Sequence, residues 1–173
     1  MAANWTAFVA GNVLTAAQLN GVVDNFEDVA IFNETQSSGT NGGSNALTYT
    51  KRTLNTTVVN NITGCSIASS VITLPAGTFE IYASAPAFKC EEHQIRLANT
   101  TDSTYSYGTS EYVGAGDSIQ SRSFVSTVLT IAASKDFEIQ HICGASKATN
   151  GFGVAGSHGN SEIFTQIKIR RVS

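Results

Sequence analysis

Charge is scarce in this sequence: aspartate, glutamate, lysine and arginine make up only 13% of the 173 residues, and the formal net charge is −3. Without a surplus of positive charge the chain has no field that attracts phosphate groups. No run approaches the ~20 apolar residues of a membrane-spanning helix, and the start of the chain lacks the basic and apolar regions of a secretion signal. We therefore expect no nucleic-acid partner, no membrane insertion and synthesis in a cytoplasm.

Metal-binding and catalytic motifs are also missing. The three cysteines form no CxxC pair, so we expect small buried residues and neither a disulfide framework nor a thiolate site: Cys65, Cys90 and Cys143. The three histidines lack the close mutual spacing of a zinc site: His93, His141 and His158. The chain has no G-x-S-x-G nucleophile elbow and no phosphate-binding glycine loop. We predict no enzymatic activity, no metal and no cofactor.

Proline is limited to Pro75 and Pro86, whereas threonine, serine, asparagine, alanine and glycine are abundant, a balance typical of β-rich domains. Short runs alternate apolar and polar residues between turn signals, as half-buried strands do. The pattern predicts strands over residues 52–60, 69–74, 78–88, 92–100, 119–132, 136–143 and 161–172. The predicted fold is mainly β, an antiparallel sandwich or jelly roll.

One helix signal stands near the start of the chain. Thr15 and Gln18 have the spacing of a capping box, which places the first helical turn near Ala16. Apolar residues then recur at steps of three and four: Leu19, Val22, Phe26 and Val29. A short helix with one apolar stripe needs a partner, because it is marginal alone in water. It packs onto its own domain or docks to another subunit or a larger assembly.

The segment after this helix is poor in apolar residues. Residues 33–45 read NETQSSGTNGGSN and contain three glycines. Such a segment buries too little surface to order itself, so it predicts a flexible tether. A tether separates the helix from the β-rich remainder of the chain and favours docking of the helix to another object. The predicted organisation is an anchor with an amphipathic helix over residues 1–32, a flexible linker over 33–45, and a jelly-roll head over 46–173.

Four stretches of the head carry a resemblance: LPAGTFEIYASAPAF, HQIRLANTT, SFVSTVLTIAASKDFEIQHIC and FTQIKIRRV. Together they resemble the tumour-necrosis-factor-like jelly roll that is shared with the globular heads of complement-type proteins. That family forms compact trimers. The resemblance therefore implies a homotrimer in which either the small-residue face that carries Ala83, Ala85 and Ala87 or the terminal strand packs near the threefold axis.

The opening stretch resembles a narrower group. The pattern W-x-x-x-x-x-G-x-V-L-T-A-A-Q-L-N, from Trp5 to Asn20, is similar to N-terminal segments of tailed-phage fibre, head-fibre and decoration proteins. In such proteins the segment fixes the chain to the virion and a β-rich trimeric head projects outward. No shaft repeats separate anchor and head here, which favours a short decoration or knob. The residues expected to bind the partner are Trp5, Phe8, Val9, Leu14, Leu19, Val22, Phe26 and Val29.

Two regions of the head are candidates for surface recognition. Residues 144–160 (GASKATNGFGVAGSHGN) predict a long hairpin loop, and loops on rigid β scaffolds often carry recognition; Phe152 and His158 lie in it. Tyr105, Tyr107 and Tyr112 form a polar-aromatic patch of the kind that suits sugars. Plain connection for the loop, and ordinary strand tyrosines for the patch, are the alternative interpretations.

The sequence thus predicts a non-enzymatic, trimeric virion structural protein, a capsid decoration or head-fibre protein whose partners are other virion proteins. The first alternative is a receptor-binding protein of a tail tip or fibre that adheres to a host surface glycan. The second, less favoured, is a hydrolase that acts on surface polysaccharide.

Overall fold

The structure is a computed structural model and describes residues 11, 13, 15, 16 and 28–172. The expected helix therefore lies almost wholly outside the described residues, and residues 28–172 contain no helix. The same holds for seven of the eight residues expected to bind a partner: Trp5, Phe8, Val9, Leu14, Leu19, Val22 and Phe26. Their roles stay predictions.

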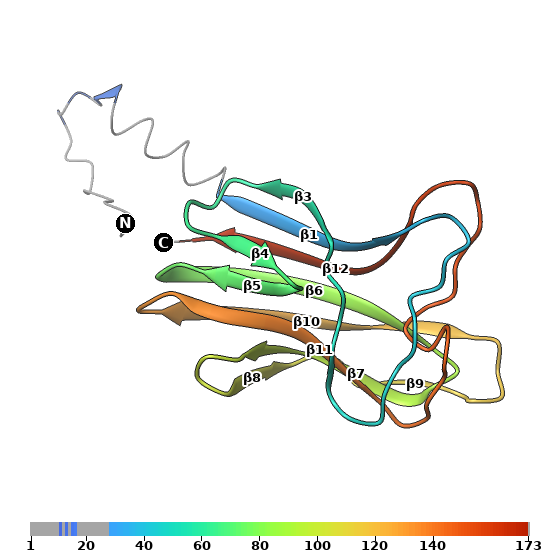
Figure 1. Cartoon of the computed structure of the whole chain (residues 1–173). Coiled ribbons are helices and arrows are strands. Elements are labelled where there is room, and N and C mark those ends of the chain that lie inside the picture. The colour runs from blue at the N-terminus through green and yellow to red at the C-terminus, as the bar shows by residue number, and fades with distance from the viewer. Residues whose placement is uncertain (1–10, 12, 14, 17–27, 173) are drawn as a thin grey trace.

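The described chain folds into two layers of antiparallel strands (Figure 1). The strands in chain order are β1 (Val29–Gln36), β2 (Thr50–Lys51), β3 (Thr56–Asn60), β4 (Ser66–Ala68), β5 (Val71–Leu74), β6 (Gly77–Phe88), β7 (Glu91–Asn99), β8 (Thr104–Tyr107), β9 (Glu111–Val113), β10 (Gln120–Ile131), β11 (Lys135–Cys143) and β12 (Glu162–Arg171). The first sheet has the order β10-β6-β12-β1-β3. The second has the order β4-β5-β11-β7-β8, with β2 paired to β11 and β9 paired to β7. The predicted antiparallel sandwich is confirmed.

Alternation along the strands sets the core between the two sheets. On β6 the residues Phe79, Ile81, Ala83 and Ala85 are fully buried, and the intervening Glu80 is exposed. Burying one face of each sheet removes apolar surface from water and is the main stabilising term of such a sandwich. The small-residue face expected at a threefold axis therefore points into the domain's own core, and that half of the expectation is wrong.

The first strand runs across the predicted boundary between the anchor and the linker. β1 pairs with β12 on one side and with β3 on the other, and its side chains of Ala30 and Phe32 are fully buried. Val29, expected on the helix seam, pairs instead with Arg170. The end of the predicted anchor and the start of the predicted tether thus form one strand, because the slot between β12 and β3 satisfies its backbone on both edges.

The rest of the predicted tether is also ordered, because it pairs with the long loop after β11. The amide of Gly42 donates to the carbonyl of Gly153 at 2.9 Å, and the amide of Phe152 donates to the carbonyl of Gly43 at 3.0 Å. The Asn45 side chain accepts from the amide of Lys147 at 2.6 Å. Figure 1 shows both segments at the end of the sandwich away from the end of β12. Two stretches that each read as flexible satisfy each other's polar groups there.

Glycine is required at one point of this contact. Gly153 has φ +137°, and a Cβ there would lie 2.3 Å from a ring carbon of Phe164. The close approach covers Phe164, which is buried although it points away from the core of the sandwich. The loop therefore covers the outer face of the first sheet at the start of β12.

Candidate functional site

An arginine held between tyrosine rings dominates the outer face of the second sheet. Arg96 on β7 faces away from the core, and its guanidinium carbon lies 3.8 Å from the ring centroid of Tyr49 and 3.7 Å from that of Tyr105. Its Nε and Nη2 both donate to Oε1 of Gln140, at 2.9 and 2.7 Å. Two cation–π contacts and a two-pronged hydrogen bond leave this cation fixed in orientation.

A third tyrosine completes this tyrosine–arginine cluster, which consists of Tyr49, Arg96, Tyr105 and Tyr107. The Tyr107 ring centroid lies 6.4 Å from that of Tyr49 and 6.2 Å from that of Tyr105, within the usual range of ring contacts. Tyr105 is 44% exposed and Tyr107 is 58% exposed. Burial raises the pKa of the Tyr49 phenol, although the nearby guanidinium of Arg96 opposes the shift. The cluster is a rigid aromatic surface that is open to solvent.

A groove of about 450 Å³ lies beside the cluster on the same face. Its lining includes Leu47, Tyr49, Glu92, Gln94, Ser110 and Ile142. Tyr49 donates its hydroxyl hydrogen to Oε1 of Gln94 at 3.0 Å, which links the cluster to the groove. Tyr112 on β9 lies opposite Glu92 and is 67% exposed. The groove thus has exposed tyrosines near both of its ends.

A second feature, a buried polar network, lies inside the sandwich. Arg52 and Glu34 form an ion pair with 2.8 Å between Nη2 and Oε2, and the side chains of both are almost fully buried. Thr165 donates to the same carboxylate oxygen at 2.6 Å and accepts from Nε of Arg52 at 2.8 Å. Arg52 also donates to the carbonyl of Phe152 at 2.9 Å and stands 4.1 Å from the centroid of that ring. Every charge in this network has a partner.

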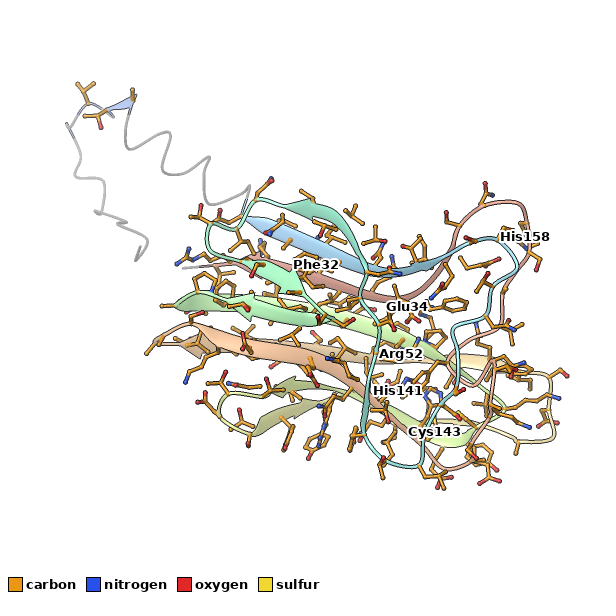
Figure 2. All side chains as sticks on the ribbon, viewed as in Figure 1. Phe32, Glu34, Arg52, His141, Cys143 and His158 are labelled. Atoms are coloured by element: carbon orange, nitrogen blue, oxygen red, sulfur yellow. The ribbon has the colours of Figure 1, made fainter. Side chains whose placement is uncertain are left out.

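The network continues into a pair of histidines. Nδ1 of His93 lies 3.0 Å from Nε2 of His141, and Nε2 of His93 lies 2.8 Å from Oγ of Ser121. The His141 ring stacks on Phe152 with 5.3 Å between centroids. Figure 2 shows Glu34, Arg52, His141 and Cys143 following one another through the space between the layers. These groups connect both sheets to the two loops that pair at this end of the sandwich, residues 37–49 and 144–161, which we call the capping loops.

One proton position follows from this geometry. Nδ1 of His141 is buried without a hydrogen-bond partner among the described residues. A buried N–H without an acceptor costs more than a bare ring lone pair. We therefore assign the shared proton to Nε2 of His141, which donates to His93, and the Nε2 proton of His93 to the Ser121 contact. Both rings are then neutral.

Comparison with known proteins identifies the fold. No protein family profile and no curated protein sequence matches this chain. Among solved structures it is similar to the globular domain of zebrafish complement 1qA protein, with a TM-score of 0.52, 13% sequence identity, and coverage of 84% of this chain and 95% of that one. It is also similar to murine APRIL at pH 8.0, with a TM-score of 0.51, 8% identity, and coverage of 82% and 97%. The chain therefore shares the fold of these two domains, an antiparallel two-sheet β sandwich of the jelly-roll type. The PRD1 vertex protein P5 overlaps 85% of this chain and 98% of its own length at 16% identity, with a TM-score of 0.49.

Only two of the predicted recognition residues lie together on the surface of the domain. Tyr105 and Tyr107 lie together in the tyrosine–arginine cluster, whereas Tyr112 lies apart, at the far side of the groove. His158 is exposed on the loop before β12 (Figure 2). The prediction that Phe152 is a surface residue is wrong: its ring is buried, because it packs over the Arg52 guanidinium on one side and stacks on His141.

Sequence reasoning missed Tyr49, Gln94 and Arg96. The alternation of β7 places Gln94 and Arg96 on the outer face, so the sequence does signal their exposure. Nothing in the sequence signals that Tyr49 stacks on Arg96, because 47 residues separate them and only the pairing of β2 with β11 brings them together. Alternation of period two predicts the face of the strand on which a residue lies, but not its contact in a distant segment.

The three cysteines are free and buried in the jelly roll, as expected. Burial raises the pKa of the Cys65 thiol to about 11, so this sulfur is a weak nucleophile. Cys90 and Cys143 contact one another, and the pKa of Cys90 is raised by that contact and then by burial. Among the residues that the structure describes, no three histidine, cysteine or acidic side chains come together as metal ligands do. Those residues also include no helix that is long and apolar enough to cross a membrane.

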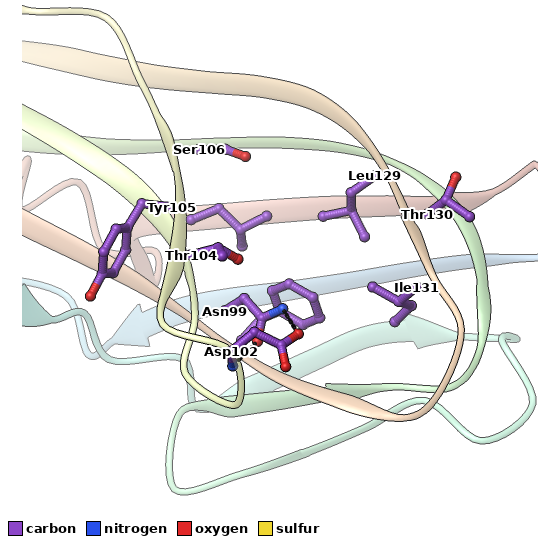
Figure 3. A pocket seen from close by; sticks show the side chains of 10 residues that line it. Asn99, Asp102, Thr104, Tyr105, Ser106, Leu129, Thr130 and Ile131 are labelled. Atoms are coloured by element: carbon purple, nitrogen blue, oxygen red, sulfur yellow. Dashed lines mark hydrogen bonds between the residues drawn. The ribbon is translucent and has the colours of Figure 1, made fainter.

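A further pocket of about 330 Å³ opens between the sheets near β8 and the end of β10 (Figure 3). Its polar groups bind each other: Asn99 donates to Oδ2 of Asp102 at 2.9 Å, and Asp102 pairs with Lys135 at 2.6 Å. The contact with Lys135 lowers the pKa of the Asp102 carboxyl. These contacts fix the wall of this pocket, which is smaller than the groove of about 450 Å³.

The buried histidines predict an acid-sensitive fold. Burial, and then the charge of Arg52, lowers the pKa of His93 to about 4, and the same causes lower that of His141 well below 6.5. A histidine with a depressed pKa in the folded state binds protons more strongly when unfolded, so stability is full above about pH 6.5 and falls as the pH drops toward 4. Between about pH 7.5 and 5 we expect a loss on the order of 2–4 kcal/mol.

Urea unfolding at the two pH values measures this loss. His93→Gln should reduce the difference between them, since one titrating ring is removed while a polar side chain remains. His158→Gln, at an exposed position, should leave the difference unchanged and serves as the control. Equal pH dependence in the wild type and in His93→Gln would contradict the assignment.

Proposed function

We propose that this chain is a non-enzymatic structural protein of a virus particle, a trimeric capsid decoration or head-fibre protein attached by its N-terminal segment. The observation that carries the proposal is the combination of a complement- and tumour-necrosis-factor-like jelly roll with an opening stretch, Trp5 to Asn20, that resembles virion attachment segments of tailed phages. Binding is the mechanism, and three tethered copies would raise the effective concentration of each contact.

The ends of the domain suit such a role. The amide of Arg171 donates to the carbonyl of Asp28 at 3.0 Å, so the chain enters β1 beside the end of β12. The two capping loops lie at the other end of the sandwich (Figure 1). An anchor that precedes Asp28 would hold one end of the domain to the particle and leave the loop end pointing outward.

We place the contact between subunits on the outer face of β10, β6 and β12. Tyr82 on β6 is 48% exposed and Val128 on β10 is 64% exposed. Arg170 and Glu80 form an ion pair at 2.9 Å on this face, and Lys168 lies opposite Tyr82. A face that carries apolar groups and both signs of charge can meet further copies of the same chain without unpaired charge. This assignment keeps the terminal strand, β12, near the threefold axis.

The mass in solution and attachment to particles test the proposal. The full chain is expected to show the mass of three chains by light scattering and to sediment with particles of the virus that carries it. Val128→Asp should give single chains, because an unpaired carboxylate in the interface costs several kcal/mol. Leu47→Asp changes an exposed aliphatic residue in the loop before β2, away from this face, and should leave the trimer intact. A single-chain mass for the unmodified protein would refute the trimer, and failure to sediment would refute the virion role.

A second candidate function is adhesion to a host glycan. The observation that favours it is the exposed tyrosine–arginine cluster with its groove. Rigid aromatic surfaces with fixed polar groups are common features of binding sites. No observation favours the hydrolase alternative.

A further inference from the structure

We infer that the groove beside the tyrosine–arginine cluster binds a neutral oligosaccharide. This inference rests on the second candidate function and gives it a ligand class and a set of residues. Oligosaccharide binding requires neither the trimer nor the particle. Failure of this inference would therefore leave the virion role untouched, and failure of the virion role would leave this inference untouched.

The shape of the site comes from strand register. Tyr107 lies opposite Arg96 and Tyr112 lies opposite Glu92, on the same outer face of β7. Four residues of a strand separate these two positions, which places the tyrosines about 13 Å apart along the groove. Both rings are largely exposed and attached to paired strands, so they can cover the apolar C–H faces of a short sugar chain at little cost in entropy.

The floor between the tyrosines offers fixed polar groups. The Gln94 amide donates to the carbonyl of Gly108 at 2.9 Å and to Oγ of Ser110 at 3.2 Å, while its oxygen accepts from Tyr49. These bonds fix the Ser110 hydroxyl and the Gln94 amide before any ligand arrives. Preorganised groups lower the entropy cost of binding.

The charge of the site selects for neutral sugars. The Glu92 carboxylate lies over Gly144, where an added Cβ would approach it to 2.5 Å, and it has no hydrogen-bond or ion-pair partner among the described residues. Carboxylate oxygens accept strong hydrogen bonds from hydroxyl groups. Among the residues that the structure describes, no lysine or arginine lines the groove, and the guanidinium of Arg96 is occupied by two rings and Gln140. An anionic sugar would meet the Glu92 carboxylate and no free cation.

The groove lies at the end of the domain opposite Asp28, where an adhesion site on an anchored chain would be needed. Glu92 and Gly144 belong to the end where β7 begins and β11 finishes, and Gly144 donates its amide to the carbonyl of Glu92 at 2.8 Å. That end carries the capping loops, whereas Asp28 lies at the opposite end beside Arg171. A chain held through its N-terminal segment would present the groove away from its anchor.

The test is amide NMR of the full chain titrated with gluco-, malto-, chito- and galacto-oligosaccharides at millimolar concentration, together with an acidic oligogalacturonide. We expect shifts at Gln94, Ser110 and Tyr112 with at least one neutral sugar. Tyr107→Ala and Tyr112→Ala should each weaken binding about tenfold, the loss of one ring contact. Glu92→Gln should also weaken it, because a neutral amide accepts less strongly than a carboxylate.

The control is Val58→Ala, which alters an exposed residue on β3 of the other sheet and should bind like the unmodified chain. Absence of shifts with all the neutral sugars would overturn the inference. Binding of the acidic sugar alone would also overturn it. The same holds if the shifts caused by a neutral sugar keep their full size in the double variant Tyr107→Ala, Tyr112→Ala.

Discussion

Deleting residues 1–32 is expected to leave the jelly roll largely unfolded, whereas deleting residues 1–27 is expected to leave it folded. The longer deletion removes Val29 to Phe32 from the middle of a sheet, where they pair with both β12 and β3. Loss of the fully buried Phe32 ring alone costs about 3–5 kcal/mol. The exposed edges of β12 and β3 add to this cost, and the whole domain has only about 5–15 kcal/mol to lose.

Circular dichroism and thermal unfolding of the two truncations measure this difference. The shorter deletion keeps Asp28, whose carbonyl accepts from Arg171, so its melting temperature should match that of the full chain. It should also no longer sediment with particles, if the preceding residues are the anchor. A longer deletion that still unfolds cooperatively near the temperature of the full chain would show that β1 is dispensable.

Arg52→Met is expected to destabilise the domain by about 3–5 kcal/mol, the typical cost of leaving a buried charge without its partner. The substitution keeps most of the side-chain volume but leaves Glu34 buried beside Thr165 with no cation. It also removes the donor to the Phe152 carbonyl. In a domain of this size the melting temperature should fall by roughly 10–20 °C.

Two variants make this result specific. Lys51→Met removes the neighbouring cation, whose partly exposed contact with Glu138 is 3.5 Å long, and should cost no more than about 1 kcal/mol. Arg52→Met combined with Glu34→Leu removes both charges and should be more stable than Arg52→Met alone, because a buried pair replaced by apolar groups is often tolerated. Equal melting temperatures for Arg52→Met and Lys51→Met would contradict the role of the network.

The sequence predicts the long strands best. β6, β7, β10, β11 and β12 each have nine or more residues and lie close to the predicted ranges. Short strands escape prediction: β8 and β9 have only four and three residues, too few for period two to emerge from the background. The range 69–74 forms part of a hairpin of β4 and β5, because Ser69 and Ser70 adopt positive φ and turn the chain.

The prediction for β1 is wrong for a physical reason. Val29 fits the three- and four-residue steps of the preceding stripe, and the residues from Asn33 onward are polar, so local sequence favours a helix followed by a tether. The side chain of Glu34 is nevertheless buried, because Arg52 supplies its counter-charge from 18 residues away. A buried glutamate is unfavourable until its partner is known, and the partner is not a local feature.

The candidate site was also predictable from the sequence only in part. The sequence alone points to an aromatic surface at Tyr105 and Tyr107, because tyrosines gather there among polar residues. The stacking of Arg96 between Tyr49 and Tyr105, and the groove that Tyr112 flanks, depend on strand pairs formed between distant segments.

The sequence by itself determined the class of fold, the absence of a charge field, and the buried positions of the cysteines, because composition and period-two alternation act locally. Tertiary structure alone decided that residues 29–36 form a strand of the sandwich, which loops are ordered, and which tyrosines meet. Those outcomes depend on polar groups that are costly to bury alone and become stable only when a partner from a distant segment satisfies them.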